Sequence, residues 1–531
     1  MFKFLWRKLR LAHLRKKNPL PRMYRELSPD LEVNLTAIRR ELGASPDLII
    51  RRITVGSAPA TTGALLYIDG LIDQQIVHRD IISPLLNGEK GRKGQDSKGL
   101  LEYLVRQVLS VGAVKKEPKF EPVVQALLEG KTVLFLDGQA EALLLATEGW
   151  EKRAINEPDA ERIILGPHEG FTENIRINTA LLRRKITNPG LHFEEMKLGR
   201  RTRTTVAIAY LKGIVNEKLV AEVRSRLKRV NIDLVLDANY LNEFISDAPF
   251  SIFPTVGFTE RPDVTAAKLL EGRVAIFVDG TPVVSTVPVL LVESFQSPDD
   301  YNFPYYYATF IRWFRYISFV LAVLAPALFV ALGSYHQELI PTPLLITIKS
   351  ATEGTPFPLV VEMVMMGAVF EIIREAGVRL ARPVGQTISI VGALVVGEAA
   401  VTAGLVGAPT IIVIAITAIA TFVVPDLLGP GIILRLFFTI LAGVFGAYGI
   451  LIGLLFILLH LTSLRSFGVP YLSPLVPLSP GDLKDVLIRA PIWAMRTRPR
   501  LIGWSQPERQ PFGFGSSGTE EGEEGEAEDG G

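Results

Sequence analysis

Cysteine is absent from this chain of 531 residues. The absence excludes a disulfide framework, a thiolate metal site and a cysteine nucleophile. The sequence also lacks a Walker A loop, a dinucleotide-binding glycine pattern and a histidine–glutamate zinc spacing. Its six histidines are scattered, which is more typical of ordinary surface or core positions. We therefore expect no enzyme activity, no cofactor and no bound metal.

A strong net charge is lacking as well. The formal charge is +2, which gives no reason to expect a nucleic-acid partner. The charge is unevenly placed, because residues 1–25 carry nine Lys or Arg and no acid. Phe2, Leu5, Trp6 and Leu9 share one helical face in this segment, which would lie on anionic lipid or form a solvated terminus. It is too charged for a cleavable signal peptide.

Long hydrophobic runs are present, and all lie in the second half of the chain. Five apolar segments occupy 316–333, 357–373, 387–406, 409–424 and 431–460. A helix needs about 20 apolar residues to cross the hydrocarbon core of a bilayer. The sequence therefore predicts a membrane protein in which a cytoplasmic α/β region precedes a polytopic α-helical transmembrane bundle.

The orientation follows from basic residues at the ends of these segments. Arg312 and Arg315 precede the first segment, and Arg465 and Arg489 follow the fifth, so both flanks are expected in the cytoplasm. Five crossings cannot begin and end on one side. Our preferred interpretation is four crossings plus one re-entrant or interfacial segment among the second to fourth. The alternative is that segment 431–460 folds back on itself near Gly446–Gly449.

Carboxylates inside the apolar segments are the candidate functional residues. Glu371 and Arg374, and Glu375 and Arg379, have the spacing of intrahelical ion pairs. Glu362 and Glu398 have no such partner, and an unpaired carboxylate in lipid is costly. Each of the two therefore faces water or an ion path, or else packs as a neutral, hydrogen-bonded group.

The soluble region contains an internal repeat. Residues 127–138 and 269–280 both read as a helix end, a glycine cap, an apolar strand and an Asp-Gly turn. We infer a duplicated cytoplasmic α/β domain. The predicted division of the chain is a basic segment at 1–47, lobe 1 at 48–160, a linker helix at 161–194, lobe 2 at 195–312, the transmembrane domain at 313–465, a basic cytoplasmic segment at 466–510 and a disordered acidic tail at 511–531. The linker helix is either a docking helix between lobes or subunits, or a simple linker.

Several long strings resemble the A subunit of the spore germinant receptors, the GerA family. They are GPHEGFTENIRINTALLRRKI at 166–186, GRRTRTTVAIAYLKGIVN at 199–216, TERPDVTAAKLLEGRVAIFVDGTPVV at 259–284, YHQELIPTPLL at 335–345, EGTPFPLVVEM at 353–363, FEIIREAGVRLARPVGQTISIVGALVVGEAAVTAGLV at 370–406 and SFGVPYLSP at 466–474. The resemblance extends over about 48–500 and departs from the family pattern at Thr352 and Glu398.

The resemblance implies a nutrient sensor subunit that triggers spore germination from the spore inner membrane. It implies a permease-like B subunit and a lipoprotein C subunit as partners, and self-association as a pentamer into a nutrient-gated cation channel. The alternatives are a non-conducting scaffold subunit and a stage V sporulation AF-type paralogue that amplifies ion release. The nutrient and the ion are not specified.

The resemblance also assigns roles to individual residues of this chain. Glu362 and Glu398 would face water or ions. A cytoplasmic collar would comprise Glu371, Arg374, Glu375 and Arg379. An inter-lobe joint would comprise Gly166, Pro167, Glu169, Phe171, Glu173, Arg261, Pro262 and Asp263.

Overall fold

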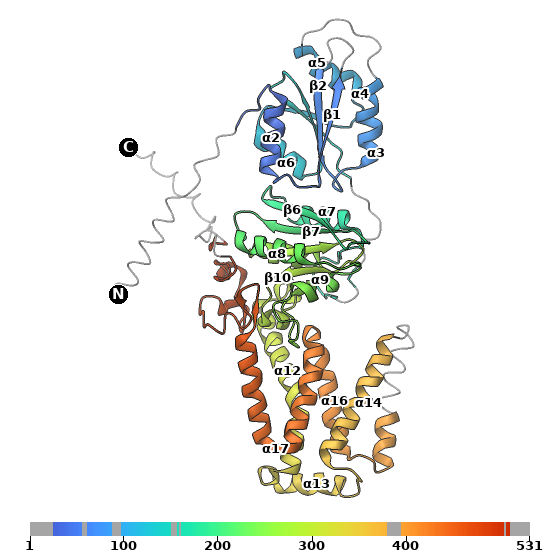
Figure 1. Cartoon of the computed structure of the whole chain (residues 1–531), viewed down its shortest axis with the longest axis vertical. Helices are drawn as coiled ribbons and strands as arrows, with labels where there is room; N and C mark the ends of the chain where they lie inside the picture. The colour runs from blue at the N-terminus through green and yellow to red at the C-terminus, as the bar shows by residue number, and fades with distance from the viewer. Residues whose placement is uncertain are drawn as a thin grey trace, which may run out of the picture.

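The computed structural model describes residues 25–55, 61–87, 97–149, 157–158, 161–379, 395–503 and 506–509. The chain is elongated, with a first α/β lobe, a second α/β lobe and a helical bundle stacked along its long axis (Figure 1). The predicted basic helix around Phe2–Leu9 and the acidic tail at 511–531 lie outside the described residues.

The first lobe is a sandwich of helices around an antiparallel sheet. Its strands are β1 (Leu48–Val55), β2 (Thr61–Ile68), β3 (Val114–Glu117), β4 (Thr132–Leu136) and β5 (Ala142–Leu145), in the order β1-β2-β4-β5-β3. Every residue of β4 and β5 is buried, because helices cover both faces of the sheet. One face carries α2 (Leu31–Glu41) and α6 (Phe120–Leu128). The other carries α3 (Gln74–Ile76), η1 (Val77–Ile82), α4 (Ser83–Asn87), α5 (Ser97–Tyr103) and η2 (Leu104–Val108) (Figure 1).

The second lobe has the same arrangement. Its strands are β6 (Leu191–Leu198), β7 (Thr204–Leu211), β8 (Gly257–Thr259), β9 (Val274–Val278) and β10 (Val284–Val287), in the order β6-β7-β9-β10-β8. One face carries α7 (Ile175–Lys185) and α10 (Pro262–Leu270). The other carries α8 (Glu217–Arg229) and α9 (Ala238–Ile245). In strand order and helix placement, the second sheet therefore matches the first.

The first helix of each lobe is held by matching hydrogen bonds. In the first lobe, the Asn34 side chain donates to the Ser28 carbonyl at 2.6 Å. The Asp137 carboxylate accepts from the backbone N–H of Leu31 at 3.3 Å. Asp137 begins the Asp-Gly turn after β4, so this turn caps α2 from across the lobe.

In the second lobe, Asn178 donates to the Thr172 carbonyl at 2.6 Å. Asp279, from the Asp-Gly turn after β9, accepts from the N–H of Ile175 at 3.2 Å. The helix α7 therefore stands where α2 stands in the first lobe. Segment 161–194, expected to be a linker, contributes the first helix of the second lobe.

Residues expected to lie in the basic N-terminal segment also belong to a lobe. Leu31, Leu35, Ile38 and Leu42 are at most 4% exposed and form part of the first core. They are spaced by three or four residues, so they occupy one face of α2. The first lobe therefore begins well before Leu48.

The bundle contains helices that are apolar over most of their length. They are α12 (Tyr305–Ser334), α13 (Thr342–Thr352), α14 (Leu359–Arg379), α16 (Ala408–Phe422) and α17 (Leu428–Ser463), with a further helix over 395–402 between α14 and α16. Among the described residues, two stretches are long and apolar enough to cross a membrane, Tyr305–Ser334 and Pro425–Ser463. The short helix α13 lies across the end of the bundle that is remote from the lobes (Figure 1).

The helix α17 reverses direction at Gly446, which has φ 62° and ψ −144°. A Cβ atom on Gly453 would lie 2.7 Å from the ring of Phe438. On one straight helix those two residues would be about 22 Å apart. The rings of Phe437 and Phe456 are 6.3 Å apart, which is also too close for one straight helix. Segment 431–460 therefore folds back, which is the second of the two alternatives that the sequence left open.

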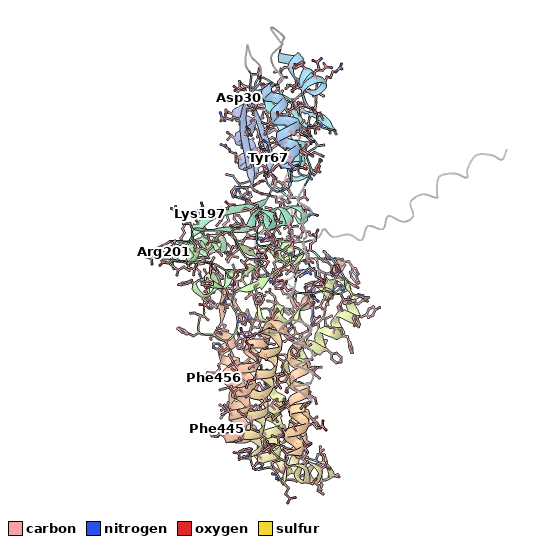
Figure 2. The ribbon with its side chains drawn as sticks, turned by 90° about the vertical axis from the view of Figure 1, so that its right-hand side faces the viewer. Asp30, Tyr67, Lys197, Arg201, Phe445 and Phe456 are labelled. Atoms are coloured by element: carbon pink, nitrogen blue, oxygen red, sulfur yellow. The ribbon has the colours of Figure 1, made fainter. Side chains whose placement is uncertain are left out.

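The two halves of α17 run antiparallel along α12, and their aromatic residues lie partly on the outside. Figure 2 shows Phe445 and Phe456 on the surface of the bundle, with exposed fractions of 56% and 60%. Each half, with about 17 residues at 1.5 Å per residue, is long enough for most of a hydrocarbon core.

The chain returns to the second lobe after α17. A two-stranded hairpin, β11 (Arg465–Ser466) and β12 (Val469–Pro470), begins this C-terminal segment. The Ser466 hydroxyl donates to the Thr255 carbonyl at 2.6 Å and accepts from the N–H of Val289 at 3.0 Å. Segment 466–503 thus covers the lobe instead of extending away from it.

Candidate functional site

Glu362 is the most deeply buried carboxylate of the bundle. It lies in the first turn of α14 and is 1% exposed. Its Oε2 atom accepts from the N–H of Gly407 at 3.1 Å and from the Thr410 hydroxyl at 3.0 Å. Both donors belong to the start of α16, where unpaired N–H groups and the helix dipole favour a carboxylate. The partner that the sequence required on another helix is therefore a helix N-terminus.

Glu371 lies nine residues further along α14, among cations. It pairs with Arg374 at 2.7 Å, as the spacing predicts, and also with Arg435 of α17. Arg435 is 8% exposed, so this pair connects two helices inside the bundle. Sequence reasoning gave Arg435 no role. The available signal was its position as a lone cation within the long segment 431–460.

The remaining predicted pair is at the surface. Glu375 and Arg379 are 2.7 Å apart, with side chains 55% and 77% exposed. Exposed pairs of this kind contribute little to stability. The proposed collar therefore consists of one partly buried network around Glu371 and one solvated pair.

Glu398 is exposed on the helix at 395–402. Within the described part of the chain, no residue forms an ion pair or hydrogen bond with it. Gly397 faces α16, since a Cβ atom there would lie 3.6 Å from Ile411. Glu398 is thus on the outside of an apolar helix that packs on the bundle.

The residues predicted for an inter-lobe joint hold the segment before α7 against the second lobe. Arg261, fully buried, donates to the Pro167 carbonyl at 2.8 Å and pairs with Asp263 at 2.8 Å. The N–H of Phe171 donates to the Glu260 carbonyl at 2.7 Å. Both connections join residues before α7 to the start of α10.

The other residues of the predicted inter-lobe joint also contact the second lobe or the segment just before α12. The Glu173 carbonyl accepts from Gly280, Glu169 pairs with Lys185 at 2.7 Å, and Pro262 begins α10. Gly166 has φ +129°, and a Cβ atom there would lie 2.7 Å from the Asn302 side chain just before α12. These contacts stay within the second lobe and its connection to the bundle.

A buried ion pair that the sequence did not reveal joins the two lobes. Arg183 of α7 and Asp47, immediately before β1, are 1% and 2% exposed and lie 2.7 Å apart. Arg183 also donates to the Leu191 carbonyl at 3.0 Å and to the Ser45 hydroxyl at 3.1 Å. Burial alone would raise the pKa of Asp47, but the Arg183 charge and hydrogen bonds hold it below its usual value. The helix α7 of the second lobe thus also contacts the first lobe.

A second buried ionic cluster joins the lobe region to the first bundle helix. We call Asp300, Arg312, Arg315 and Asp485 the junction cluster. Arg312, fully buried, pairs with Asp300 and with Asp485, both at 3.0 Å. Arg315 pairs with Asp300 at 2.7 Å. Arg312 and Arg315, from which the orientation in the membrane was predicted, therefore also hold the fold together. Asp485 connects the C-terminal segment to α12.

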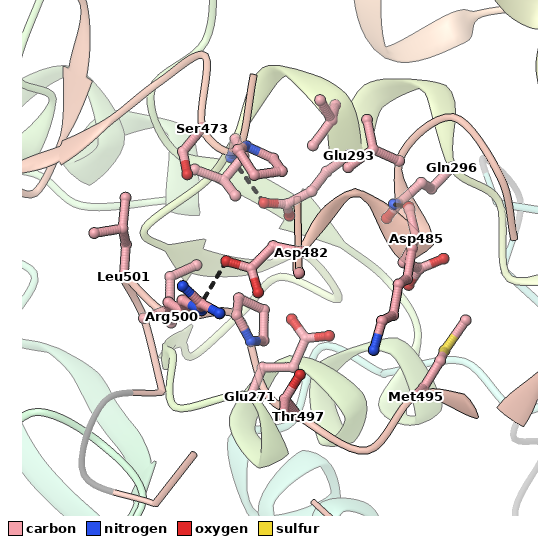
Figure 3. A pocket seen from close by; sticks show the side chains of 18 of the residues that line it. Glu271, Glu293, Gln296, Ser473, Asp482, Asp485, Met495, Thr497, Arg500 and Leu501 are labelled. Atoms are coloured by element: carbon pink, nitrogen blue, oxygen red, sulfur yellow. Dashed lines mark hydrogen bonds between the residues drawn. The ribbon is translucent and has the colours of Figure 1, made fainter. Parts of the chain in front are cut away.

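A cavity of about 90 Å³ opens beside this cluster, between the second lobe and the C-terminal segment (Figure 3). Both charge signs line it: Figure 3 shows Glu271, Glu293 and Asp482 with Arg500. Burial raises the pKa of Glu271 in spite of the neighbouring Arg273 guanidinium. Among the described residues, no group of three or more histidine and acidic side chains could hold a metal ion.

Comparison with known proteins accounts for most of the chain. The family model "Bacillus/Clostridium GerA spore germination protein" matches residues 36–501. The chain belongs to the GerA family. The match includes both lobes and the bundle, so Glu362, Glu371, Glu398 and the Asp47–Arg183 pair all lie in the GerA-family region.

Curated GerA-family relatives are similar over nearly their whole length. Spore germination protein KA of Bacillus subtilis is 43% identical over 91% of this chain and 89% of its own. GerLA of Bacillus cereus is 38% identical over 90% of this chain and 96% of its own. An uncharacterized membrane protein of Bacillus subtilis, YfkQ, is 39% identical over 90% of this chain and 92% of its own.

Among solved structures, the N-terminal domain of the A subunit of the Bacillus megaterium spore germinant receptor GerK3 is similar to this GerA-family chain. The sequence identity is 36% and the TM-score is 0.41. The similarity covers 51% of this chain and 99% of that domain.

Proposed function

We propose that this GerA-family protein is the A subunit of a nutrient germinant receptor in the inner membrane of the spore. Several copies would together form a cation channel that opens when nutrient binds and so triggers germination. The permease-like and lipoprotein subunits implied by the sequence resemblance would be its partners. The similarity to named spore germination proteins over about nine-tenths of the chain supports the role in germination.

The observation that carries the channel proposal is the exposed carboxylate of Glu398. Gly404, where the chain turns, is six positions further along, about 9 Å at the rise of a helix, so Glu398 would lie inside the apolar layer of a membrane-spanning bundle. At the centre of the hydrocarbon core a carboxylate facing lipid costs about 2.5–3.5 kcal/mol, and nearer the surface the cost is smaller but still unfavourable. A water-filled path between copies of the chain removes this cost. Such a path with acidic side chains favours cations.

The proposed topology follows from the reversal at Gly446. With α17 as a hairpin, the five apolar segments would cross the membrane an even number of times, and the chain would end on the side where it began. No re-entrant segment is then required for the basic residues at both flanks to lie in the cytoplasm. We place both lobes on that side, and we interpret them as copies of one duplicated unit because of their shared strand order and matching caps.

A non-conducting scaffold is the second candidate, and Glu362 favours it. That carboxylate is 1% exposed, and its Oε2 atom accepts two hydrogen bonds from the start of α16. If all bundle carboxylates acted in this way, the protein would only organise its partners.

Measurement of nutrient-triggered cation release from spores distinguishes the channel from the non-conducting scaffold. We expect Glu398→Gln to change the rate or the ion preference of release, because it removes a charge from the path. Glu353→Gln, at an exposed position between α13 and α14, is the matched control and should behave as wild type. Wild-type release from Glu398→Gln spores, together with no current from the purified receptor in planar bilayers, would rule out the channel.

A further inference from the structure

One aromatic side chain of the second lobe is fully exposed. Phe250, in the loop between α9 and β8, has a relative exposure of 100%. Scattered exposed hydrophobic residues are normal on soluble surfaces and need no partner. The position of Phe250 in the molecule is what sets it apart.

The loop that carries Phe250 is fixed to the end of the bundle. Ser251, the next residue, shares a hydrogen bond of 3.0 Å with His460 near the end of α17. Phe253 is 3% exposed and belongs to the bundle core, with its ring 6.2 Å from that of His460. The neighbours of Phe250 therefore face the protein, while Phe250 itself points away from it.

The surface beside this loop is the apolar outer face of α17. Leu455, Leu458 and Leu459 are 54%, 53% and 70% exposed, so lipid must cover them if the bundle spans a membrane. His460 lies three residues before the end of the helix, about 4.5 Å along its axis. The loop is thus at the depth where a bilayer changes from hydrocarbon to headgroups. Aromatic side chains are enriched at that depth.

Exposed basic side chains lie near the loop, and the loop's own Asp247 is paired with Arg226 at 2.7 Å. Arg465 is exposed directly after α17, and Lys228 and Arg229 are exposed at the end of α8. The helix α8 is connected to this region by Arg226, which donates to the Ile245 carbonyl at 2.7 Å. Basic side chains near a bilayer surface are attracted to anionic headgroups.

We propose that loop 246–253 is a membrane-contact element of the second lobe, with Phe250 inserted into the interfacial layer of the adjacent leaflet. The occupant of this surface is lipid, in continuity with the lipid-facing side of α17. The contact would fix the height of the lobe above the membrane. It goes beyond the proposed receptor function, because it applies equally to a channel and to a scaffold.

Single cysteines test this directly, since the chain has none of its own. The full-length protein, with its partner subunits where they are needed for stability, is placed in nanodiscs of phosphatidylethanolamine and phosphatidylglycerol. A nitroxide label is attached at Phe250→Cys, and its collisions with oxygen and with a water-soluble nickel chelate are compared. Leu455→Cys is the lipid control. Leu86→Cys, 58% exposed on the first lobe, is the water control.

We expect the oxygen-to-nickel collision ratio at position 250 to exceed that at position 86 several-fold and to approach that at position 455. A ratio equal to that at position 86 would show that water covers the loop and would overturn the proposal. A label shielded from both reagents, with spin–spin broadening that unlabelled protein dilutes away, would assign the surface to a second copy instead. A water-like ratio at position 455 would overturn the membrane placement of the bundle itself.

Discussion

The hydroxyl of Tyr335 donates to the carbonyl of Gly443 at 2.7 Å, which ties the end of α12 to the point where α17 turns back. It also reaches the Val444 carbonyl at 3.2 Å. These carbonyls end the first half of α17 and have no helical partner, because the chain leaves the helix at Gly446. His336 supports the other half by accepting from the N–H of Ala447 at 3.3 Å.

Removing the Tyr335 hydroxyl should therefore weaken the hairpin. We expect Tyr335→Phe to lower the unfolding free energy by about 0.5–1.5 kcal/mol, the net value of a typical hydrogen bond. Thermal unfolding of the detergent-solubilised protein measures the change. Tyr448→Phe, on the exposed side of α17, is the control and should have no effect. Equal shifts for the two variants would contradict the capping role.

The glycine at the reversal should tolerate no side chain. At φ 62° and ψ −144° the backbone is in a region that residues other than glycine rarely enter. A Cβ atom would also lie 3.0 Å from that of Tyr335. We expect Gly446→Ala to cost at least about 1–3 kcal/mol. Gly429→Ala, where a Cβ atom meets nothing within 4 Å, should be neutral or slightly stabilising.

The matching caps of the two lobes predict matching effects. Asp137→Ala and Asp279→Ala each remove a carboxylate from the start of a helix, and each should cost about 1 kcal/mol. Asp233→Ala, whose side chain is 56% exposed beside two arginines, should cost less than either. A large loss at one cap and none at the other would argue that the lobes are not equivalent copies.

The buried pair between the lobes should respond as a unit. We expect Arg183→Met to destabilise by about 3–5 kcal/mol, because it leaves the Asp47 charge buried without a partner. Adding Asp47→Asn should recover part of that loss, and a double-mutant cycle measures the coupling. The exposed pair between Arg52 and Glu32 is the control, where Arg52→Met should cost less than about 1 kcal/mol. Purely additive losses would show that the two side chains act independently.

The same pair predicts a pH dependence. The folded-state pKa of Asp47 lies below its usual value of 3.8, so the pair stabilises the protein above that pH. Stability is lost as the pH falls through the lower, folded-state pKa. We expect the difference in melting temperature between wild type and Asp47→Asn to be constant from pH 6 to about pH 4 and to shrink below it. A difference that grows on acidification would contradict this sign.

Local patterns predicted much of the fold. The repeated apolar strands with Asp-Gly turns are β4 and β9, and Gly138 and Gly280 have the positive φ that such turns require. The spacing of Glu371 and Arg374 likewise predicted their ion pair, because residues three apart share one face of a helix.

Contacts between distant segments were not predictable in this way. Asp47 and Arg183 are separated by 136 positions, and nothing in either local pattern connects them. The helix α2 lies within segment 1–47, which the nine cations of residues 1–25 identify only as a basic terminus. The cap that Glu362 provides to α16 required knowledge of which helix lies beside α14.

The junction cluster and the hairpin β11–β12 attach the second lobe to the first and the last helix of the bundle. Asp300 and Asp485 hold α12 through Arg312, while Thr255 and Val289 hold the residue that follows α17 by one turn, Ser466. A torque on that lobe would consequently rotate α12 and α17 as one rigid body. Displacement of α14 and α16, which share Glu362, relative to this body would have to break the pair between Glu371 of α14 and Arg435 of α17.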